Sequence, residues 1–187
     1  MRMTAAVLSL LLSAGAQAED VQALTAEGLA LIPPFQQQLL ETVKAAMQAG
    51  GPLKAVEACQ LQAPLIAAEH SRAPWRVGRT SLRVRNPANA ADAWEQDVLR
   101  QFAQRAAAGE PLASMQHSAV VAGEVRVMQA IAVGEPCLAC HGKTLKPELA
   151  ALLEQRYPQD QARGYELGAL RGAFTLRRSL ADAGVSQ

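Results

Sequence analysis

The chain has 187 residues, of which half are apolar, 18 are Lys or Arg and 17 are Asp or Glu. Arg2 is the only charged residue among the first 18, so residues 19–187 carry 17 basic and 17 acidic side chains and no net charge. This balance argues against a nucleic-acid partner, which calls for a basic surplus, and the apolar content argues against disorder and predicts one domain with a core.

The first 18 residues have the layout of a secretory signal peptide. Arg2 gives a short basic start, residues 5–12 form an apolar run, and Ala16-Gln17-Ala18 is a small-x-small cleavage site. The run is too short to cross a bilayer of about 30 Å as a permanent helix. We therefore predict cleavage after Ala18, a mature domain of residues 19–187 without a stable membrane span, and a periplasmic location.

Helices are predicted for the first part of the mature chain. Apolar residues fall at helical spacing over residues 20–49, with a kink or break at Pro33-Pro34, because proline lacks the backbone donor that a helix needs. Gly50-Gly51 ends this segment, and a second helix starts at a proline and covers about residues 52–69. One face of the second helix carries Val56, Cys59, Ala63 and Ile66.

Strands are predicted in the middle of the chain and near its end. Leu82 and Val84 alternate with arginines, which predicts a strand over residues 76–85 that stops at Asn86-Pro87. The further elements are a helix over 90–108, a hairpin over 115–133 with its turn at Gly123, a helix over 147–156 and a last strand over 165–176. Helices followed by strands predict an α+β fold with an antiparallel sheet.

Residues 137–141 read Cys-Leu-Ala-Cys-His, which is the C-x-x-C-H attachment motif of a c-type haem. Two thiols at this spacing bind the two vinyl groups of the macrocycle, and the histidine that follows becomes the proximal ligand of the iron. We therefore predict one covalent haem c, held by Cys137, Cys140 and His141. A thioredoxin-type dithiol, a structural zinc site and a plain disulfide are weaker alternatives, because the sequence has neither a βαβ pattern nor a second Cys/His pair at short spacing.

The distal ligand of the iron is open to several candidates at this point. They are Met47, Met115, Met128, His70, His117 and Cys59. Each Met and His also has an ordinary explanation as a core or surface residue. Cys59 lies in an apolar helix stripe where a free cysteine is commonly buried, and a ferric iron beside its sulfur would favour the thiolate.

Several sequence blocks in a fixed order carry a resemblance to a known family. They are residues 55–59 (AVEAC), 63–67 (APLIA), 79–89 (RTSLRVRNPAN) with Trp94-Glu95, 135–142 (EPCLACHG), 157–160 (YPQD) and 171–174 (RGAF). The chain resembles exported, single-haem c-type proteins with a PAS-like fold and a His/Cys-ligated iron, a family with a cyanobacterial prototype, formerly described as a domain of unknown function. Ala91 departs from the family, which has Pro there.

The resemblance implies a ligand set and an architecture. It implies that Cys59 is the distal thiolate ligand opposite His141, and that a PAS-like antiparallel sheet with flanking helices holds the haem. Arg83, Arg85 and Arg171 are candidates for pairing with the haem propionates, because a guanidinium forks well onto a carboxylate. The alternative for Arg83 and Arg85 is the solvated face of an edge strand, which we favour. Trp94 is expected to be a core residue.

These features predict a periplasmic c-type cytochrome that transfers one electron at low potential, since a thiolate stabilises ferric iron. A redox partner protein follows from this function. The alternative is a redox or gas sensor that binds a small ligand on reduced haem and signals through a separate partner, because the sequence shows no transmitter domain. We predict no enzymatic activity, since there is no second haem motif and no acid/base cluster.

Overall fold

The computed structural model describes residues 20–181, so the predicted signal peptide lies outside the described residues. Residues 20–30 are helical, and the helix α2 spans Ile32–His70. Gly50 and Gly51 leave the helical conformation and divide α2 into two arms. Gly51 has a φ of 66°, which only glycine adopts without strain. The predicted pair of helices is confirmed, and the expected break falls at Leu31, just before Pro33-Pro34.

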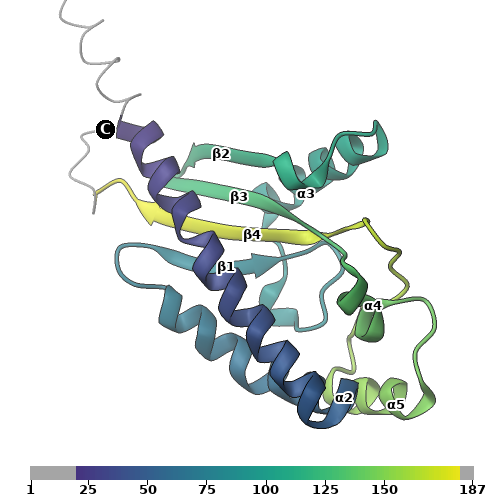
Figure 1. The fold of residues 1–187 in the computed structure, drawn as a ribbon. Helices are drawn as coiled ribbons and strands as arrows, with labels where there is room; N and C mark the ends of the chain where they lie inside the picture. The colour runs from purple at the N-terminus through teal and green to yellow at the C-terminus, as the bar shows by residue number, and fades with distance from the viewer. Residues whose placement is uncertain (1–19, 182–187) are drawn as a thin grey trace, which may run out of the picture.

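Four strands form one antiparallel sheet in the order β1-β4-β3-β2 (Figure 1). They are β1 (Arg76–Thr80), β2 (Gln116–Val121), β3 (Glu124–Ala132) and β4 (Leu170–Ser179). Ala122 and Gly123 join β2 to β3 with φ angles of 51° and 78°. This two-residue turn matches the twist of a tight hairpin. The predicted hairpin is confirmed.

The described residues contain three further α-helices: α3 (Ala93–Ala107) covers one face of the sheet, whereas α4 (Glu135–His141) and α5 (Pro147–Arg156) lie beyond its end, beside α2 (Figure 1). A capping box starts α3, in which Asp92 accepts from the Glu95 N–H and the Glu95 carboxylate accepts from the Asp92 N–H. The helix predicted for residues 147–156 is confirmed as α5. No helix within residues 20–181 combines the length and the apolar character that a bilayer crossing requires.

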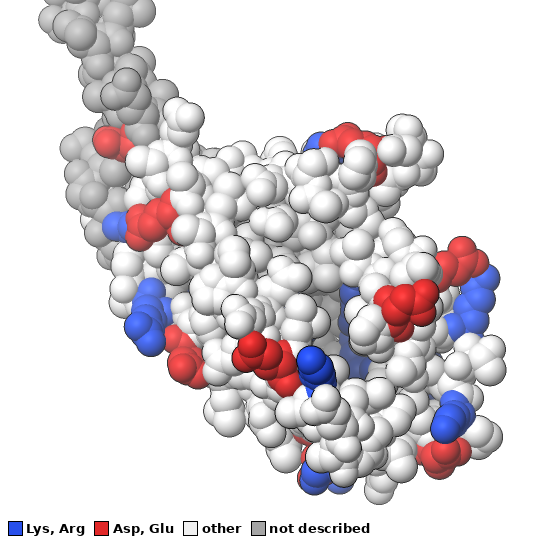
Figure 2. Space-filling model, in the orientation of Figure 1, with Lys and Arg blue, Asp and Glu red and all other residues white. Residues whose placement is uncertain are grey.

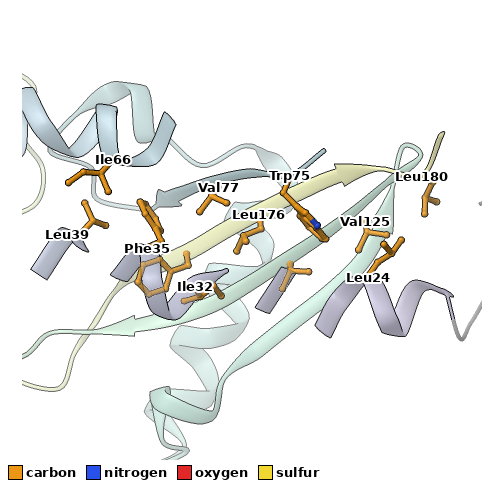
Figure 3. Packing of buried hydrophobic residues seen from close by; sticks show 12 residues of the cluster. Leu24, Ile32, Phe35, Leu39, Ile66, Trp75, Val77, Val125, Leu176 and Leu180 are labelled. Atoms are coloured by element: carbon orange, nitrogen blue, oxygen red, sulfur yellow. The ribbon is translucent and has the colours of Figure 1, made fainter. Parts of the chain in front are cut away.

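The core lies on both faces of the sheet. On one face the side chains of α2 pack against Val77, Val125, Phe174 and Leu176, as Figure 3 shows for most of this cluster. On the other face α3 packs against Met115, Met128, Ala130 and Ala173. Neighbouring residues of β3 and β4 point to opposite faces, as the pleat of a strand requires. The predicted α+β class with an antiparallel sheet is confirmed.

Two strand predictions had wrong boundaries. The strand expected over residues 76–85 ends at Thr80, because Ser81 pairs with Ala90 in an isolated bridge and its hydroxyl binds the Arg171 carbonyl. Leu82 is then 43% exposed, so its alternation with arginines does not mark a strand. The last strand starts at Leu170 rather than at 165, after Gly168 turns the chain with a φ of 77°.

Candidate haem site

The short helix α4 carries the whole C-x-x-C-H motif. Cys137 and Cys140 are free, half-buried thiols placed about one helical turn apart. Cys137 packs against a cluster that contains Val133, Ala162 and Tyr165. Cys140 packs on the other side, against the cluster of Val56, Leu149, Leu153 and Tyr157. The helix is therefore anchored between the end of the sheet and the pair of helices α2 and α5.

His141 at the end of α4 is held in one orientation by a backbone carbonyl. Its Nδ1 lies 2.7 Å from the Ala162 oxygen, so Nδ1 carries the proton and Nε2 keeps its lone pair. Burial and, as smaller effects, the charges of Arg85 and Arg171 together lower the pKa of His141 to about 3. The imidazole is therefore neutral at physiological pH, which is the form that binds a metal ion.

Cys59 comes to the same site from the second arm of α2. Its thiol has a pKa raised by burial, and the positive charges of Arg79 and Arg85 partly oppose this shift. The charge of Cys59 in turn raises the pKa of the Cys140 thiol, after the larger effect of burial. Cys59 and Cys140 are thus electrostatic neighbours although 81 positions separate them in the sequence.

Asp160 and Arg85 connect the motif helix to the loop after α5. The Asp160 side chain is 1% exposed and forms an ion pair with Arg85 at 3.2 Å. Its carboxylate also accepts from the Ala162 N–H at 2.9 Å and from Arg163 at 2.8 Å. Arg85 donates to the Cys140 carbonyl at 2.5 Å and to the Ala162 carbonyl at 3.3 Å. This network fixes the Ala162 carbonyl that orients His141.

The arginines near the site differ from the predicted edge-strand pattern. Arg85 is 11% exposed, so placing it on the solvated face of a strand was wrong. Arg83 is exposed and donates to the carbonyls of Gln161 and Arg163. Its guanidinium also lies 4.6 Å from the centre of the Tyr165 ring. The loop carbonyls and the aromatic ring, and not solvent alone, therefore hold Arg83 in place.

The other candidate ligands have structural partners elsewhere. Met115 and Met128 are fully buried in the α3-side core. Met47 packs between the two arms of α2. His70 binds the Gln38 side chain at 2.6 Å, and His117 lies against Trp94 with the ring centres 5.8 Å apart. Trp94 packs against the α3-side core, which confirms its predicted role.

The surface is hollowed beside this site. Figure 2 shows a hollow between the α2 arms and the α4 region, with Lys or Arg atoms at its floor. A second, open groove of about 360 Å³ lies nearby and is lined by Arg83, Tyr165 and Arg171 among others. Sequence reasoning missed the roles of Asp160 and Ala162, because a loop carboxylate and a backbone carbonyl carry no motif that identifies them.

Fold and site together define an α+β domain that presents a C-x-x-C-H motif on a short helix, with a half-buried third cysteine as its electrostatic neighbour. The chain belongs to the Tll0287-like family, whose family model matches residues 12–179. This confirms the family resemblance found in the sequence.

A solved structure has the same fold. It is that of the cyanobacterial heme-protein Tll0287, with a TM-score of 0.59, 23% sequence identity, and coverage of 82% of this chain and 95% of that one. At this identity the likeness shows the fold alone. No curated protein matches the chain.

The donor set of the site fits a haem group. Two free thiols stand at thioether spacing on α4, and a neutral imidazole follows them with Nε2 available. A third thiol lies among arginines on the facing helix arm. The groups are partly buried, which suits a macrocycle that is mostly apolar and carries two carboxylates.

Proposed function

We propose that the protein is a periplasmic c-type haem protein that transfers one electron at low potential, with His141 and Cys59 as the axial ligands. The observation that carries this proposal is the half-buried, neutral His141, whose Nδ1–H donates to the Ala162 carbonyl. A single bound haem would supply the one-electron couple of its iron. A separate redox protein would deliver or receive that electron, and the chain would catalyse no reaction of its own.

The residues of α4 would hold the haem in two different ways. Cys137 and Cys140 provide two thiolates for covalent attachment, which prevents loss of the group outside the cytoplasm. His141 presents Nε2, and its hydrogen bond to Ala162 raises the basicity of that nitrogen. Arg85 donates to the Ala162 carbonyl and to that of Cys140, and Asp160 accepts from the Ala162 N–H, so the imidazole has little freedom to rotate. A rigid site suits electron transfer, which needs little reorganisation.

Cys59 would set the potential. A thiolate ligand donates negative charge to iron and favours the ferric state, which lowers the reduction potential relative to a His/Met site. Burial is the larger effect and raises the pKa of the Cys59 thiol, whereas the charges of Arg79 and Arg85 act in the direction that favours the anion. Cys59 is therefore proposed as the distal thiolate ligand, with the positive charge of the iron adding to that of the two arginines.

Replacing Cys59 by Ala tests the ligand set. We expect the haem to stay covalently attached while the ferric electron paramagnetic resonance spectrum loses its low-spin thiolate signals. Met47→Leu is the matched control, since Met47 packs between the α2 arms and should leave the spectrum unchanged. An unaltered spectrum in Cys59→Ala would exclude Cys59 as a ligand.

Attachment and function have separate tests. The pyridine haemochrome spectrum of the exported protein should show a c-type haem, and it should be lost when Cys137 and Cys140 are both replaced by Ala. The sequence of the mature N-terminus should begin at Glu19.

Reduced protein that stays six-coordinate under carbon monoxide would support electron transfer, whereas ready binding of carbon monoxide would support the sensor alternative.

A further inference from the structure

Among residues 20–181, three arginines affect the pKa values of Cys59 and His141, but only one carboxylate does. Arg85 and Arg171 influence His141, and Arg79 influences Cys59. The carboxylate is Asp160, and it is already occupied by Arg85 and by Arg163. Arg79 and Arg171 have no carboxylate within ion-pair distance among residues 20–181. The site therefore carries more positive charge than its own residues compensate.

The position of Arg79 follows from the pleat of β1. Val77 and Arg79 lie on the same face of the strand, and Arg79 is directly opposite Phe174 of β4. Val77 and Phe174 both belong to the α2-side core, so the half-buried Arg79 side chain also starts on the face that α2 covers. Burial lowers the pKa of Arg79, and the charge of Cys59 opposes this shift.

Arg171 has only neutral partners. Its guanidinium donates to the Arg83 carbonyl at 3.3 Å and lies 5.4 Å from the centre of the Tyr165 ring. Burial is the main reason why the pKa of Arg171 is lowered. Arg79 and Arg171 are also close enough for the charge of Arg171 to lower the pKa of Arg79.

Two unpaired cations in one partly buried region are an unfavourable arrangement. Removing a charge from water is unfavourable unless an opposite charge compensates it. Two such guanidiniums beside a thiol and an imidazole form a region that favours the binding of an anionic ligand. Each guanidinium offers a planar fork that matches a carboxylate.

We propose that Arg79 and Arg171 bind the two propionate carboxylates of the haem. This proposal rests on the proposed function, because it needs the haem to be present. Arg85 is excluded from this role by its pairing with Asp160, and Arg83 by its backbone acceptors and exposed position. Two carboxylates would compensate the two guanidiniums that the described residues leave unpaired.

Arg79→Gln and Arg171→Gln in the holoprotein test this assignment, with Arg76→Gln as the control. Arg76 is on the same strand as Arg79 but its side chain is exposed. We expect the propionate bending band in the resonance Raman spectrum to shift in both site variants and to stay in place in the control. The reduction potential should fall in both, because losing a nearby cation favours the ferric state.

Arg79→Lys provides a conservative variant that should fold even if the Gln substitution does not. It keeps the charge and loses the fork, so we expect a shifted Raman band with a potential close to that of the unmodified protein. Raman bands that stay in place in all three site variants would overturn the proposal, even if the potential moved. The pyridine haemochrome spectrum of the unmodified protein is the separate check. If it showed no c-type haem, the proposed function would be rejected, and not only the assignment of Arg79 and Arg171 to the propionates.

Discussion

The arginines on the α3 face of the sheet and those at the candidate haem site differ in whether a carboxylate compensates their charge. On the α3 face, the Arg126 side chain is 7% exposed and pairs with Asp92 at 2.7 Å and with Glu95 at 3.2 Å. Its guanidinium also lies 4.5 Å from the centre of the Trp94 ring. At the candidate haem site, Arg79 and Arg171 are half-buried with no carboxylate partner among the described residues.

The difference separates a cluster whose charges α3 compensates from the cluster at which we propose that the haem propionates bind. Arg126 is compensated by groups that α3 itself supplies: its capping box provides both carboxylates. Glu95 also accepts from Thr175 at 2.6 Å, so the start of α3 is tied to β4 as well. The cluster needs nothing from outside the chain. The arginines of the site are compensated only if an anion binds.

Breaking the α3 cluster should have the largest effect on stability. Arg126→Met leaves the carboxylate of Glu95 buried and unpaired, and we expect a loss of about 3–5 kcal/mol in the free energy of unfolding. The haem spectrum of the folded protein should not change, since the cluster lies on the other face of the sheet. Guanidinium denaturation measures the free energy of unfolding. Arg100→Met is the control: Arg100 is 54% exposed, and the expected change is small.

Asp160→Asn should affect both stability and the site. The amide keeps the shape of the side chain but removes the charge that pairs with Arg85 and Arg163, at a cost of about 1–3 kcal/mol. Because Asp160 also holds the Ala162 backbone, the low-spin signals of the ferric protein should shift as His141 is reoriented. Glu154→Gln is the matched control, since Glu154 contacts Arg163 but is 72% exposed. Equal effects of the two variants would contradict this role of Asp160.

Local sequence patterns predicted the helices and turns whose formation depends on residues close together in the sequence. The glycine pair that divides α2, the extent of α5 and the hairpin of β2 and β3 all follow from periodicity and turn chemistry. The motif on α4 was recognisable for the same reason, because its three functional residues lie within five positions. The family resemblance, and not the pattern of residues, singled out Cys59 among six candidate ligands.

Long-range partners decided what the sequence could not predict. The ion pair of Arg85 and Asp160 joins residues 75 positions apart, and nothing near Arg85 indicates that its side chain is buried. The strand at residue 76 ends early because Ser81 binds the Arg171 carbonyl, which is 90 positions away. A period of two in the sequence cannot distinguish an edge strand from a loop whose arginines are held by a distant segment.

Acid should weaken the site network by no more than the Asp160→Asn substitution does, because protonation of Asp160 removes the same charge that pairs with Arg85 and Arg163. Burial alone would raise the pKa of Asp160, but the hydrogen bonds from Arg163 and Ala162 and the charge of Arg85 bring it below the ordinary value of 3.8. A carboxyl whose pKa is lower in the folded protein contributes stability above the unfolded value, and this contribution is lost as the pH falls through the folded value.

Urea denaturation at a series of pH values checks the sign of this effect. The difference in unfolding free energy between the unmodified protein and Asp160→Asn should be constant from neutral pH down to about pH 5, and it should shrink below about pH 4. The α3 cluster provides the comparison, because Asp92 is 47% exposed and solvent screens its contribution. A difference that shrank between pH 7 and pH 5 would mean that a histidine, and not Asp160, controls the network.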